Sequence, residues 1–280
     1  MGKIAITIGD PKGIGKEIVE KAILELNLPC DEFVILEAED SGKGCYDSLV
    51  TACEMAKRGE ITALVTGPVS KEALNKAGYK FRGQTEILSE LLGGKAEMLF
   101  IARDLRVMLL TRHLPLREVP SAINEEMIVE KTLRLNKFLK EKLKIENPRI
   151  AFCALNPHAG EGGVLGDEEI KIINPALEIL RDKGADVTGA LSADGLFALA
   201  GKKYLKGEKQ DYDAIIAAYH DQALTAVKAL AFDEVVNTTI GLPIIRTSPS
   251  SGTAYDIAGK GIADPKSMVE AIKLATTLNG

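Results

Sequence analysis

Helical and strand patterns alternate along the whole chain, and this alternation restricts its fold more than any other feature of the sequence. Apolar residues recur at helical spacing in residues 15–26 and 125–143, whereas residues 61–66 and 149–154 are short apolar runs typical of buried strands. No repeat or low-complexity tract interrupts the pattern. Because parallel strands need helical crossovers, we predict an α/β fold with a largely parallel sheet.

The same patterns give bounds for the individual elements. The expected strands are residues 3–8, 33–36, 61–66, 96–102, 105–111, 149–154 and 214–219. The expected helices are residues 15–26, 46–58, 125–143, 168–183 and 265–278. No linker rich in proline, glycine or serine marks a domain boundary, so a division into two subdomains requires a continuous sheet or a chain that leaves one subdomain and returns to it.

The composition argues against several classes of protein. With 280 residues, of which 46% are hydrophobic and 27% charged, the chain is typical of globular proteins with one large or two modest α/β domains. A net charge of −5 argues against a nucleic-acid partner, and no apolar run approaches the roughly 20 residues that span a bilayer. The four cysteines form no C-x-x-C pair, and residues 1–6 lack the layout of a signal peptide. We therefore expect a cytoplasmic protein with reduced thiols.

The chain contains only three histidines, and each follows the carboxyl end of an expected strand. His113 follows residues 105–111, His158 follows residues 149–154, and His220 follows residues 214–219. Ligands of open α/β sheets bind at this edge, and three imidazoles suit a zinc-like divalent ion. The alternative is three unrelated histidines in loops or in the core. Asp221, next to His220, would either hydrogen-bond a metal-bound imidazole or cap a helix.

Two glycine-containing segments follow the first and third expected strands. Residues 9–15 turn from a strand into a helix, but they fit neither the G-x-G-x-x-G dinucleotide fingerprint nor the P-loop spacing. Residues 66–71 leave another strand, with Ser70 expected to cap a helix. Lys71 is either a solvated charge or a ligand contact.

Two further segments are candidate ligand contacts. Residues 83–86 open a short helix, whose free amides and dipole favour phosphate, although Thr85 would equally serve as an ordinary N-cap. Residues 156–163 form a long polar glycine loop, and such a loop seldom serves only the core.

Short motifs spread along the chain form a specific set. They are I-G-D-P at 8–11, G-I-G at 13–15, T-G-P-V at 66–69, Gly83 with T-E at 85–86, Thr111, H-L-P-L at 113–116, L-N-P-H-A-G-E at 155–161, A-D at 193–194, Y-H-D-Q at 219–222, G-L-P at 241–243 and I-R-T-S at 245–248. From residue 4 to about residue 270 the chain resembles the 4-hydroxythreonine-4-phosphate dehydrogenase family of pyridoxal phosphate biosynthesis. The resemblance implies NAD-dependent oxidation, with decarboxylation, of 4-hydroxythreonine-4-phosphate to 3-amino-2-oxopropyl phosphate.

The resemblance also implies roles for individual residues. His113, His158 and His220 match the family's metal ligands, which implies a divalent ion shared across the interface of a homodimer, with zinc expected first and magnesium, manganese or cobalt as alternatives. The matching substrate-binding positions are Gln84, Thr85, Lys228, Asn237 and Arg246. Lys228 and Arg246 would hold the anionic ends of a small phosphorylated hydroxy acid. Asp194 is the candidate proton acceptor, and its alternative role is to cap a helix that begins near Gly195.

A second resemblance concerns the cofactor. Residues 252–261, G-T-A-Y-D-I-A-G-K-G, are similar to the adenosine-binding loop of isopropylmalate dehydrogenase, a related β-decarboxylating enzyme. The resemblance assigns cofactor contacts to Gly252, Thr253, Ala254 and Asp256. Asp256 would hydrogen-bond the ribose hydroxyls and repel a 2′-phosphate, which favours NAD over NADP. Its alternative is an ordinary charge on a surface helix.

The family fold divides the chain into two α/β subdomains that share a largely parallel sheet core, with an active-site cleft between them. We predict a cofactor-side subdomain of residues 1–93 and 244–280. Residues 94–243 would form a central subdomain that carries the metal ligands and the dimer interface.

Several residues depart from the family pattern. Gln84 stands where the family usually has histidine in G-H-T-E, and glutamine does not titrate. P-S-S at 249–251 replaces a hydrophobic-Asp-His sequence, Gly195 replaces threonine, and the chain is shorter than typical members. These departures leave open a paralogous dehydrogenase for phosphorylated threonate or erythronate. Alternatives of other classes are a three-histidine zinc hydrolase, which would leave residues 252–261 without a role, and a non-catalytic binding protein, against which the three histidines and Arg246 argue.

Overall fold

The computed structural model describes residues 2–29, 31–81 and 83–279 and separates the chain into two compact units. Unit 1 comprises Met1–Ala96 and Asp233–Gly280, and unit 2 comprises Glu97–Phe232. The predicted subdomain bounds need a correction, because residues 233–243 belong to unit 1 and not to the central unit. The reason is strand pairing, since β9 (Val236–Ile240) runs antiparallel to β10 (Ile245–Pro249) in unit 1.

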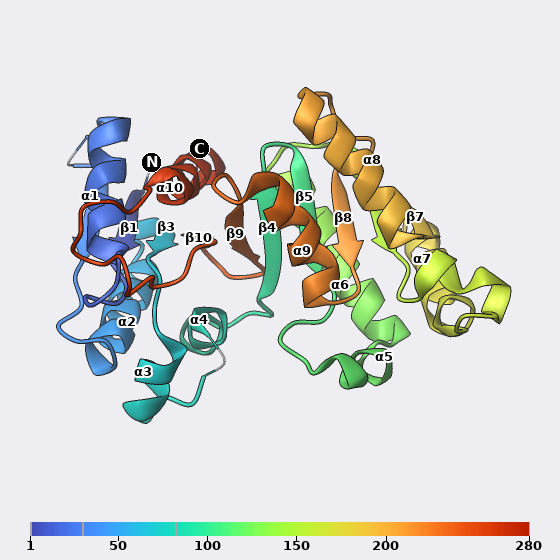
Figure 1. The fold of residues 1–280 in the computed structure, drawn as a ribbon, viewed down its shortest axis with the longest axis horizontal. Helices are drawn as coiled ribbons and strands as arrows, with labels where there is room; N and C mark the ends of the chain where they lie inside the picture. The colour runs from blue at the N-terminus through green and yellow to red at the C-terminus, as the bar shows by residue number, and fades with distance from the viewer. Residues whose placement is uncertain (1, 30, 82, 280) are drawn as a thin grey trace. The chain divides into compact units, whose positions relative to one another are not determined.

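Unit 1 is a doubly wound α/β unit with strand order β2-β1-β3-β10-β9, in which only β9 is antiparallel to its neighbour within the unit (Figure 1). Its elements are β1 (Lys3–Thr7), α1 (Gly15–Leu26), β2 (Phe33–Leu36), α2 (Lys43–Lys57), β3 (Ile61–Thr66), α3 (Lys71–Lys76), α4 (Gln84–Leu92), β9, β10 and α10 (Lys266–Asn279).

Helices cover both faces of the unit 1 strands. The connection β1–α1–β2 and the connection β2–α2–β3 run in opposite directions along the sheet, so right-handed crossovers place α1 and α2 on opposite faces. α10 contacts α1, β3, β9 and β10, whereas α2 contacts α4, β1 and β3. Figure 1 shows α10 on one side of these strands and α2 with α4 on the other. The inner strands β1, β3 and β10 are therefore largely buried on both faces, which explains their apolar runs, whereas the edge strand β2 is partly exposed.

Glycine permits the close approach of the β1 and β3 exits. A Cβ on Gly67 would lie 2.3 Å from the carbonyl oxygen of Ile8, and a Cβ on Gly15 would lie 1.9 Å from the same atom. The Gly67 amide donates to the Thr7 carbonyl at 2.7 Å, and the Asp10 amide donates to the Pro68 carbonyl at 2.8 Å. The turn at residues 9–15 is therefore tight because two strand exits are bonded together beneath it.

Unit 2 has strand order β4-β5-β8-β6-β7, with β4 antiparallel to β5 and the other pairs parallel. Its elements are β4 (Glu97–Ala102), β5 (Leu105–Leu109), η1 (Leu116–Glu118), α5 (Val119–Ala122), α6 (Glu125–Glu141), β6 (Arg149–Cys153), η2 (Pro157–Gly163), η3 (Glu169–Ile173), α7 (Asn174–Asp182), β7 (Asp186–Leu191), α8 (Ala193–Lys206), β8 (Ala214–Ala217) and α9 (His220–Ala231). α6 contacts α7, and α8 contacts α9.

The predicted α/β fold with a mostly parallel sheet is confirmed. The expected strand at 61–66 and the expected helix at 15–26 are found with the same bounds. The helix expected over 168–183 is found as a continuous helical segment, in which residues 169–173 are wound as a π-helix that leads into α7. The distortion accompanies burial of the Glu169 carboxylate, which accepts hydrogen bonds from the Leu155 and Asn156 amides.

The described cysteines lie in the core. Cys45, Cys53 and Cys153 are free and buried. Burial raises the pKa of the Cys45 thiol to about 12 and that of the Cys53 thiol to about 11. Cys30 lies outside the described residues. Within the described part of the chain, no helix combines the length and the hydropathy needed to cross a membrane.

The core predicts a large difference between two leucines of unit 1. Leu64 in β3 is 0% exposed, whereas Leu24 near the end of α1 is 80% exposed. Leu64→Ala should lower the free energy of unfolding by about 2–5 kcal/mol, because it removes buried methyl groups and leaves a cavity. Leu24→Ala should change it by less than about 0.5 kcal/mol. Urea titration followed by circular dichroism measures both values, and equal losses would contradict the burial assigned to β3.

Candidate active site

Three adjacent strand exits in unit 2 carry the histidines. Because β8 lies between β5 and β6 and all three strands are parallel, their carboxyl ends share one edge. The imidazole rings of His113 and His220 have centroids 5.6 Å apart, with an angle of 42° between their planes. The Nδ1 atom of His220 lies 2.6 Å from an Asp221 carboxylate oxygen. Two histidines that are 107 positions apart in sequence are thus neighbours.

His158 belongs to a loop with unusual backbone geometry. It is exposed and lies in η2, where residues 158–162 all have positive φ angles. The buried Glu169 carboxylate holds the start of this loop, since it accepts both the Leu155 and the Asn156 amide at 2.8 Å. A charge-assisted bond of this kind is stronger than a neutral one, which suits a residue that fixes a strained loop.

The histidines fit a divalent metal ion in donor chemistry. Across the described residues, no group of three or more His, Cys, Asp and Glu side chains is close enough to hold a metal ion. The His113 and His220 pair nevertheless supplies two imidazoles side by side, and the Asp221 contact leaves Nε2 of His220 as the nitrogen available to a ligand. His158 follows the neighbouring strand β6, so the donor types suit such an ion, but the three imidazoles of this chain are not gathered around one point.

Asp194 lies in the first turn of α8. The Ser192 hydroxyl donates to its carboxylate, and this bond, followed by that from the Gly195 amide, holds the pKa of Asp194 below its usual range. The charge of His158 contributes in the same direction. Asp194 is therefore an ionised, exposed carboxylate. The N-cap position of α8 is Ser192, so Asp194 lies inside the first turn of the helix and does not occupy the cap position itself.

Lys228 lies on α9 and is half-buried. Its ammonium is 6.0 Å from the centre of the Phe232 ring. Burial lowers the pKa of Lys228 below its usual value.

The buried guanidinium of Arg246 lies in unit 1. Arg246 is 3% exposed, and its hydrogen bonds go to neutral hydroxyls. Nε and Nη2 donate to Thr66 Oγ1 at 3.2 and 2.7 Å, and Nη1 donates to Thr239 Oγ1 at 3.0 Å. Burial lowers the pKa of Arg246 to about 10, while the charge of Glu86 opposes this shift. Among the described residues, the hydrogen bonds of Arg246 therefore go to uncharged side chains.

Amide oxygens in unit 1 also lack partners. Gln84 begins α4 and donates from Nε2 to the Gly67 carbonyl at 2.9 Å. Its Oε1 atom and Oδ1 of Asn237 are buried without a hydrogen-bond partner among the described residues. Thr85, 5% exposed, follows in the first turn of α4. Buried polar atoms are nearly always bonded, so these atoms are candidates for ligand contacts.

The loop 252–261 is bonded to α1 and the preceding turn. The Tyr255 hydroxyl donates to the Asp10 carboxylate at 2.6 Å, and the Ile14 amide donates to the Thr253 carbonyl at 3.0 Å. At the other end, Lys21 donates to the Gly261 carbonyl at 2.9 Å. Asp256 is exposed in a turn and not in a helix, and as an exposed charge it remains open to either role. Gly252, Thr253 and Ala254 precede it in extended or irregular backbone.

Sequence reasoning missed the residues that hold these loops. Asp10 was part of a recognised motif, but its bond to Tyr255 joins residues 245 positions apart. Glu169 lies within the helix expected over 168–183, where no local pattern distinguishes it from its neighbours. Neither partnership leaves a local signal, because each depends on how distant elements meet.

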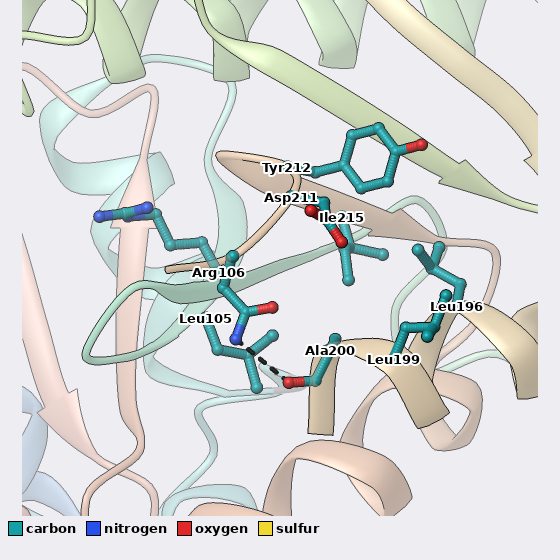
Figure 2. Close-up of a pocket in the computed structure, with 9 residues that line it drawn as sticks. Leu105, Arg106, Leu196, Leu199, Ala200, Asp211, Tyr212 and Ile215 are labelled. Atoms are coloured by element: carbon teal, nitrogen blue, oxygen red, sulfur yellow. Dashed lines mark hydrogen bonds between the residues drawn. The ribbon is translucent and has the colours of Figure 1, made fainter. Parts of the chain in front are cut away.

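A small pocket in unit 2 lies elsewhere (Figure 2). It has a cavity volume of about 30 Å³ and is lined by Leu105, Arg106, Leu196, Leu199, Ala200, Gln210, Asp211, Tyr212 and Ile215. It contains none of the predicted site residues. Leu105 and Ile215 lie at the amino ends of β5 and β8, the opposite edge from His113 and His220. A volume of this size has room for a water molecule and not for a metabolite.

Known proteins are similar to this chain in sequence and in fold. Residues 16–275 match the family described as pyridoxal phosphate biosynthetic protein PdxA. A 4-hydroxythreonine-4-phosphate dehydrogenase of Sulfurihydrogenibium is 36% identical, with 99% of this chain and 98% of the relative aligned. The crystal structure of a 4-hydroxythreonine-4-phosphate dehydrogenase from Klebsiella pneumoniae superposes with a TM-score of 0.84 and 31% identity over the whole of both chains.

A more distant structure shares the fold alone. The β-decarboxylating dehydrogenase of Thermococcus kodakarensis matches with a TM-score of 0.55 and 17% identity, over 99% of this chain and 84% of that one. The family resemblance stated from the motifs is confirmed by the match over residues 16–275 and by the 36% identical relative. The chain belongs to the PdxA family of pyridoxal phosphate biosynthetic proteins.

Proposed function

We propose that this chain is a dehydrogenase that uses NAD and a divalent metal ion to convert 4-hydroxythreonine-4-phosphate, oxidatively and with loss of CO2, to 3-amino-2-oxopropyl phosphate in pyridoxal 5′-phosphate biosynthesis. Its curated relatives carry the name of this dehydrogenase. The observation that carries the proposal is the buried Arg246 guanidinium, whose described partners are all neutral.

Arg246 requires an anion for chemical reasons. Taking a cation out of water is costly, and hydroxyl groups return only part of the lost hydration. A phosphate or carboxylate would add a charge partner bonded directly to the guanidinium, whose planar shape suits two parallel bonds to either group. Thr85 at the start of α4 adds amides that favour phosphate. The free oxygens of Gln84 and Asn237 would accept hydrogen bonds from substrate hydroxyl or amino groups.

The proposed reaction places separate demands on the protein. The hydroxyl-bearing carbon gives a hydride to the oxidised nicotinamide and its O–H proton to a base. The oxidised carbon is now a ketone. On the neighbouring carbon, the bond to the carboxylate breaks, CO2 leaves, and the electron pair that remains on that carbon takes a proton. Bound together, a divalent metal ion and NAD would supply Lewis-acid activation of the hydroxyl group and the hydride acceptor.

The chain's own residues would divide the remaining work. His113, His158 and His220 would hold the metal ion, with Asp221 fixing the tautomer of His220. Asp194 would accept the proton as an ionised carboxylate, although its lowered pKa makes it a weaker base. Lys228 would hold an anionic end of the substrate, and its lowered pKa reflects a cation partly removed from water.

The 252–261 loop supports the assignment of NAD. Its attachment to Asp10 and α1 gives a fixed loop on which Asp256 is exposed to solvent. A carboxylate in that position would accept hydrogen bonds from ribose hydroxyls and repel the 2′-phosphate of NADP. Thr253, Ala254 and Gly252 would line the adenosine side.

We further propose that the enzyme is a cytoplasmic homodimer with shared active sites, with zinc the first candidate metal and magnesium, manganese or cobalt the others. The support is the resemblance of the three histidines to the family's ligand set. Neutral Gln84 favours one rival within the same chemistry, a paralogue that oxidises phosphorylated threonate or erythronate. A zinc hydrolase or a non-catalytic binding protein finds less support, because the curated relatives are named dehydrogenases.

Replacing Arg246 tests the proposed function. Arg246→Met should lower kcat/KM for NADH formation by roughly 10- to 100-fold or more, since a hydrogen bond to a charged group is worth about 1.5–3 kcal/mol. Arg106→Met removes a partly buried guanidinium in unit 2, outside the predicted site, and should leave kcat/KM of the folded enzyme close to wild type. The assay uses a panel of phosphorylated hydroxy acids, with and without a chelator. Absence of NADH formation with every acid and metal would overturn the proposed function.

Asp256→Ala tests the cofactor assignment. The wild-type enzyme should prefer NAD strongly over NADP, and the variant should narrow the ratio of the two kcat/KM values because it removes both a hydrogen bond and a repulsion. Asp182→Ala, an exposed aspartate at the end of α7, should leave the ratio unchanged. Equal use of both cofactors by the wild type would contradict the role given to Asp256.

Gln84→His tests whether position 84 contacts the substrate. Loss of a charge-assisted bond costs about 1.5–3 kcal/mol, so a histidine here should lower KM for 4-hydroxythreonine-4-phosphate by roughly 10-fold or change the ranking of acids. Metal and NAD dependence should stay the same. Asn75→His adds a histidine at an exposed position of α3 in the same unit. This variant should change neither KM nor the ranking of acids. Unchanged KM and ranking in Gln84→His would remove residue 84 from the site.

A further inference from the structure

The strand exits that carry the histidines of unit 2 lie where the backbone ladder between β6 and β8 has ended. The last paired residues of these strands are Phe152 and Ile216. Two positions further along each chain lie Ala154 and Ala218, both about 1% exposed. From here one chain enters the 155–163 loop and the other turns into α9, so a gap opens between two buried backbones.

The side-chain amide of Gln222 spans this gap. Its Oε1 atom accepts the Ala218 amide at 2.7 Å, and its Nε2 atom donates to the Ala154 carbonyl at 2.8 Å. A glutamine amide has the same donor and acceptor as a peptide group, so it takes the place of one missing rung between the two exits. Glutamate would lack the donor and would place a negative charge against the Ala154 carbonyl.

Thr111 makes the matching connection on the other side of β8. Its hydroxyl donates to the Ala218 carbonyl at 2.7 Å, and its amide donates to the same carbonyl at 3.1 Å. Thr111 is 4% exposed, so these bonds are protected from water. Ala218 is thus held through its amide by Gln222 and through its carbonyl by Thr111.

We propose that Gln222 and Thr111 are positioning residues that fix the three histidine-bearing exits relative to one another. His113 comes two residues after Thr111, His220 two residues after Ala218, and His158 four residues after Ala154. Because these separations are short, a shift of any one of the three exits would also displace the imidazole that follows it. The inference rests on the proposed function in one respect, the assignment of the histidines as metal ligands.

The test measures metal affinity of the stripped protein and needs no turnover. Each variant is titrated with Zn²⁺ in competition with a chromophoric chelator, and the visible absorption of bound Co²⁺ reports the ligand geometry. Gln222→Ala should weaken Zn²⁺ affinity by roughly 10- to 100-fold, the usual effect of removing a residue that orients metal ligands. Thr111→Val should weaken it in the same direction, and Thr111→Ser, which keeps the hydroxyl, should restore it.

Two matched controls in unit 2 separate positioning from general loss of stability. Gln210→Ala removes a buried glutamine that lines the small pocket of unit 2 and donates to the Ala200 carbonyl at 3.1 Å. Thr132→Val removes a buried hydroxyl that donates to the Ile128 carbonyl at 2.6 Å within α6. Both should lower the melting temperature and leave Zn²⁺ affinity within about twofold of wild type, since neither bond touches a histidine-bearing exit.

The outcomes separate this inference from the proposed function. If the wild-type chain binds Zn²⁺ and His220→Ala does not, the metal site is supported. If Gln222→Ala and Thr111→Val then bind Zn²⁺ as tightly as the wild type, only the positioning role is overturned. The same conclusion follows if the controls weaken Zn²⁺ binding as much as Gln222→Ala does. A wild-type chain that binds no divalent metal overturns the metal site and the inference together.

Discussion

The parallel pairing of β5, β8 and β6 is the interaction on which the rest of unit 2 depends. β8 is later in the chain than β5 and β6, yet it lies between them, and backbone hydrogen bonds fix the register on both sides. Parallel strands end at the same edge, so the pairing brings His113 beside His220 and leaves His158 on the adjacent exit. Thr111 and Gln222 continue this order past the point where the ladder stops. Between the β6 and β8 exits, the Ala218 amide and the Ala154 carbonyl are bonded by the Gln222 side chain instead of by each other's backbone.

A different constraint governs unit 1, the cost of burying charge. Arg246 is in β10, where its guanidinium has only the Thr66 and Thr239 hydroxyls as hydrogen-bond partners among the described residues. A protein that needed the cation only for stability would gain from a carboxylate partner. The arrangement makes sense if the partner is a bound anion. In the same unit, the 252–261 loop lies at the surface. Its backbone is held by the bond from Tyr255 to Asp10 and by the bond from Lys21 of α1 to the Gly261 carbonyl.

Much of the fold could be predicted because apolar periodicity is a local property. The bounds of α1, β2 and β3 follow from the sequence alone, and the placement of each histidine after a strand follows from the same patterns. Residues 168–183 are helical as expected, but the sequence did not predict the π-helical winding at 169–173, where Glu169 turns inward to bind two loop amides. The subdomain bounds failed at 233–243 because the pairing of β9 with β10 is a tertiary event.

The sequence by itself therefore determined the α/β class, the strand exits on which the candidate ligands lie, and, through its motifs, the family. Only the tertiary structure decided which exits are neighbours, which charges are buried and which side chains bridge distant backbones. The physical reason is that strand order, desolvation and the partners of Arg246, Asp10 and Gln222 arise from contacts between residues far apart in the chain. Hydrophobic periodicity indicates which face of each segment is buried in the core, but it does not indicate which other segment packs against that face.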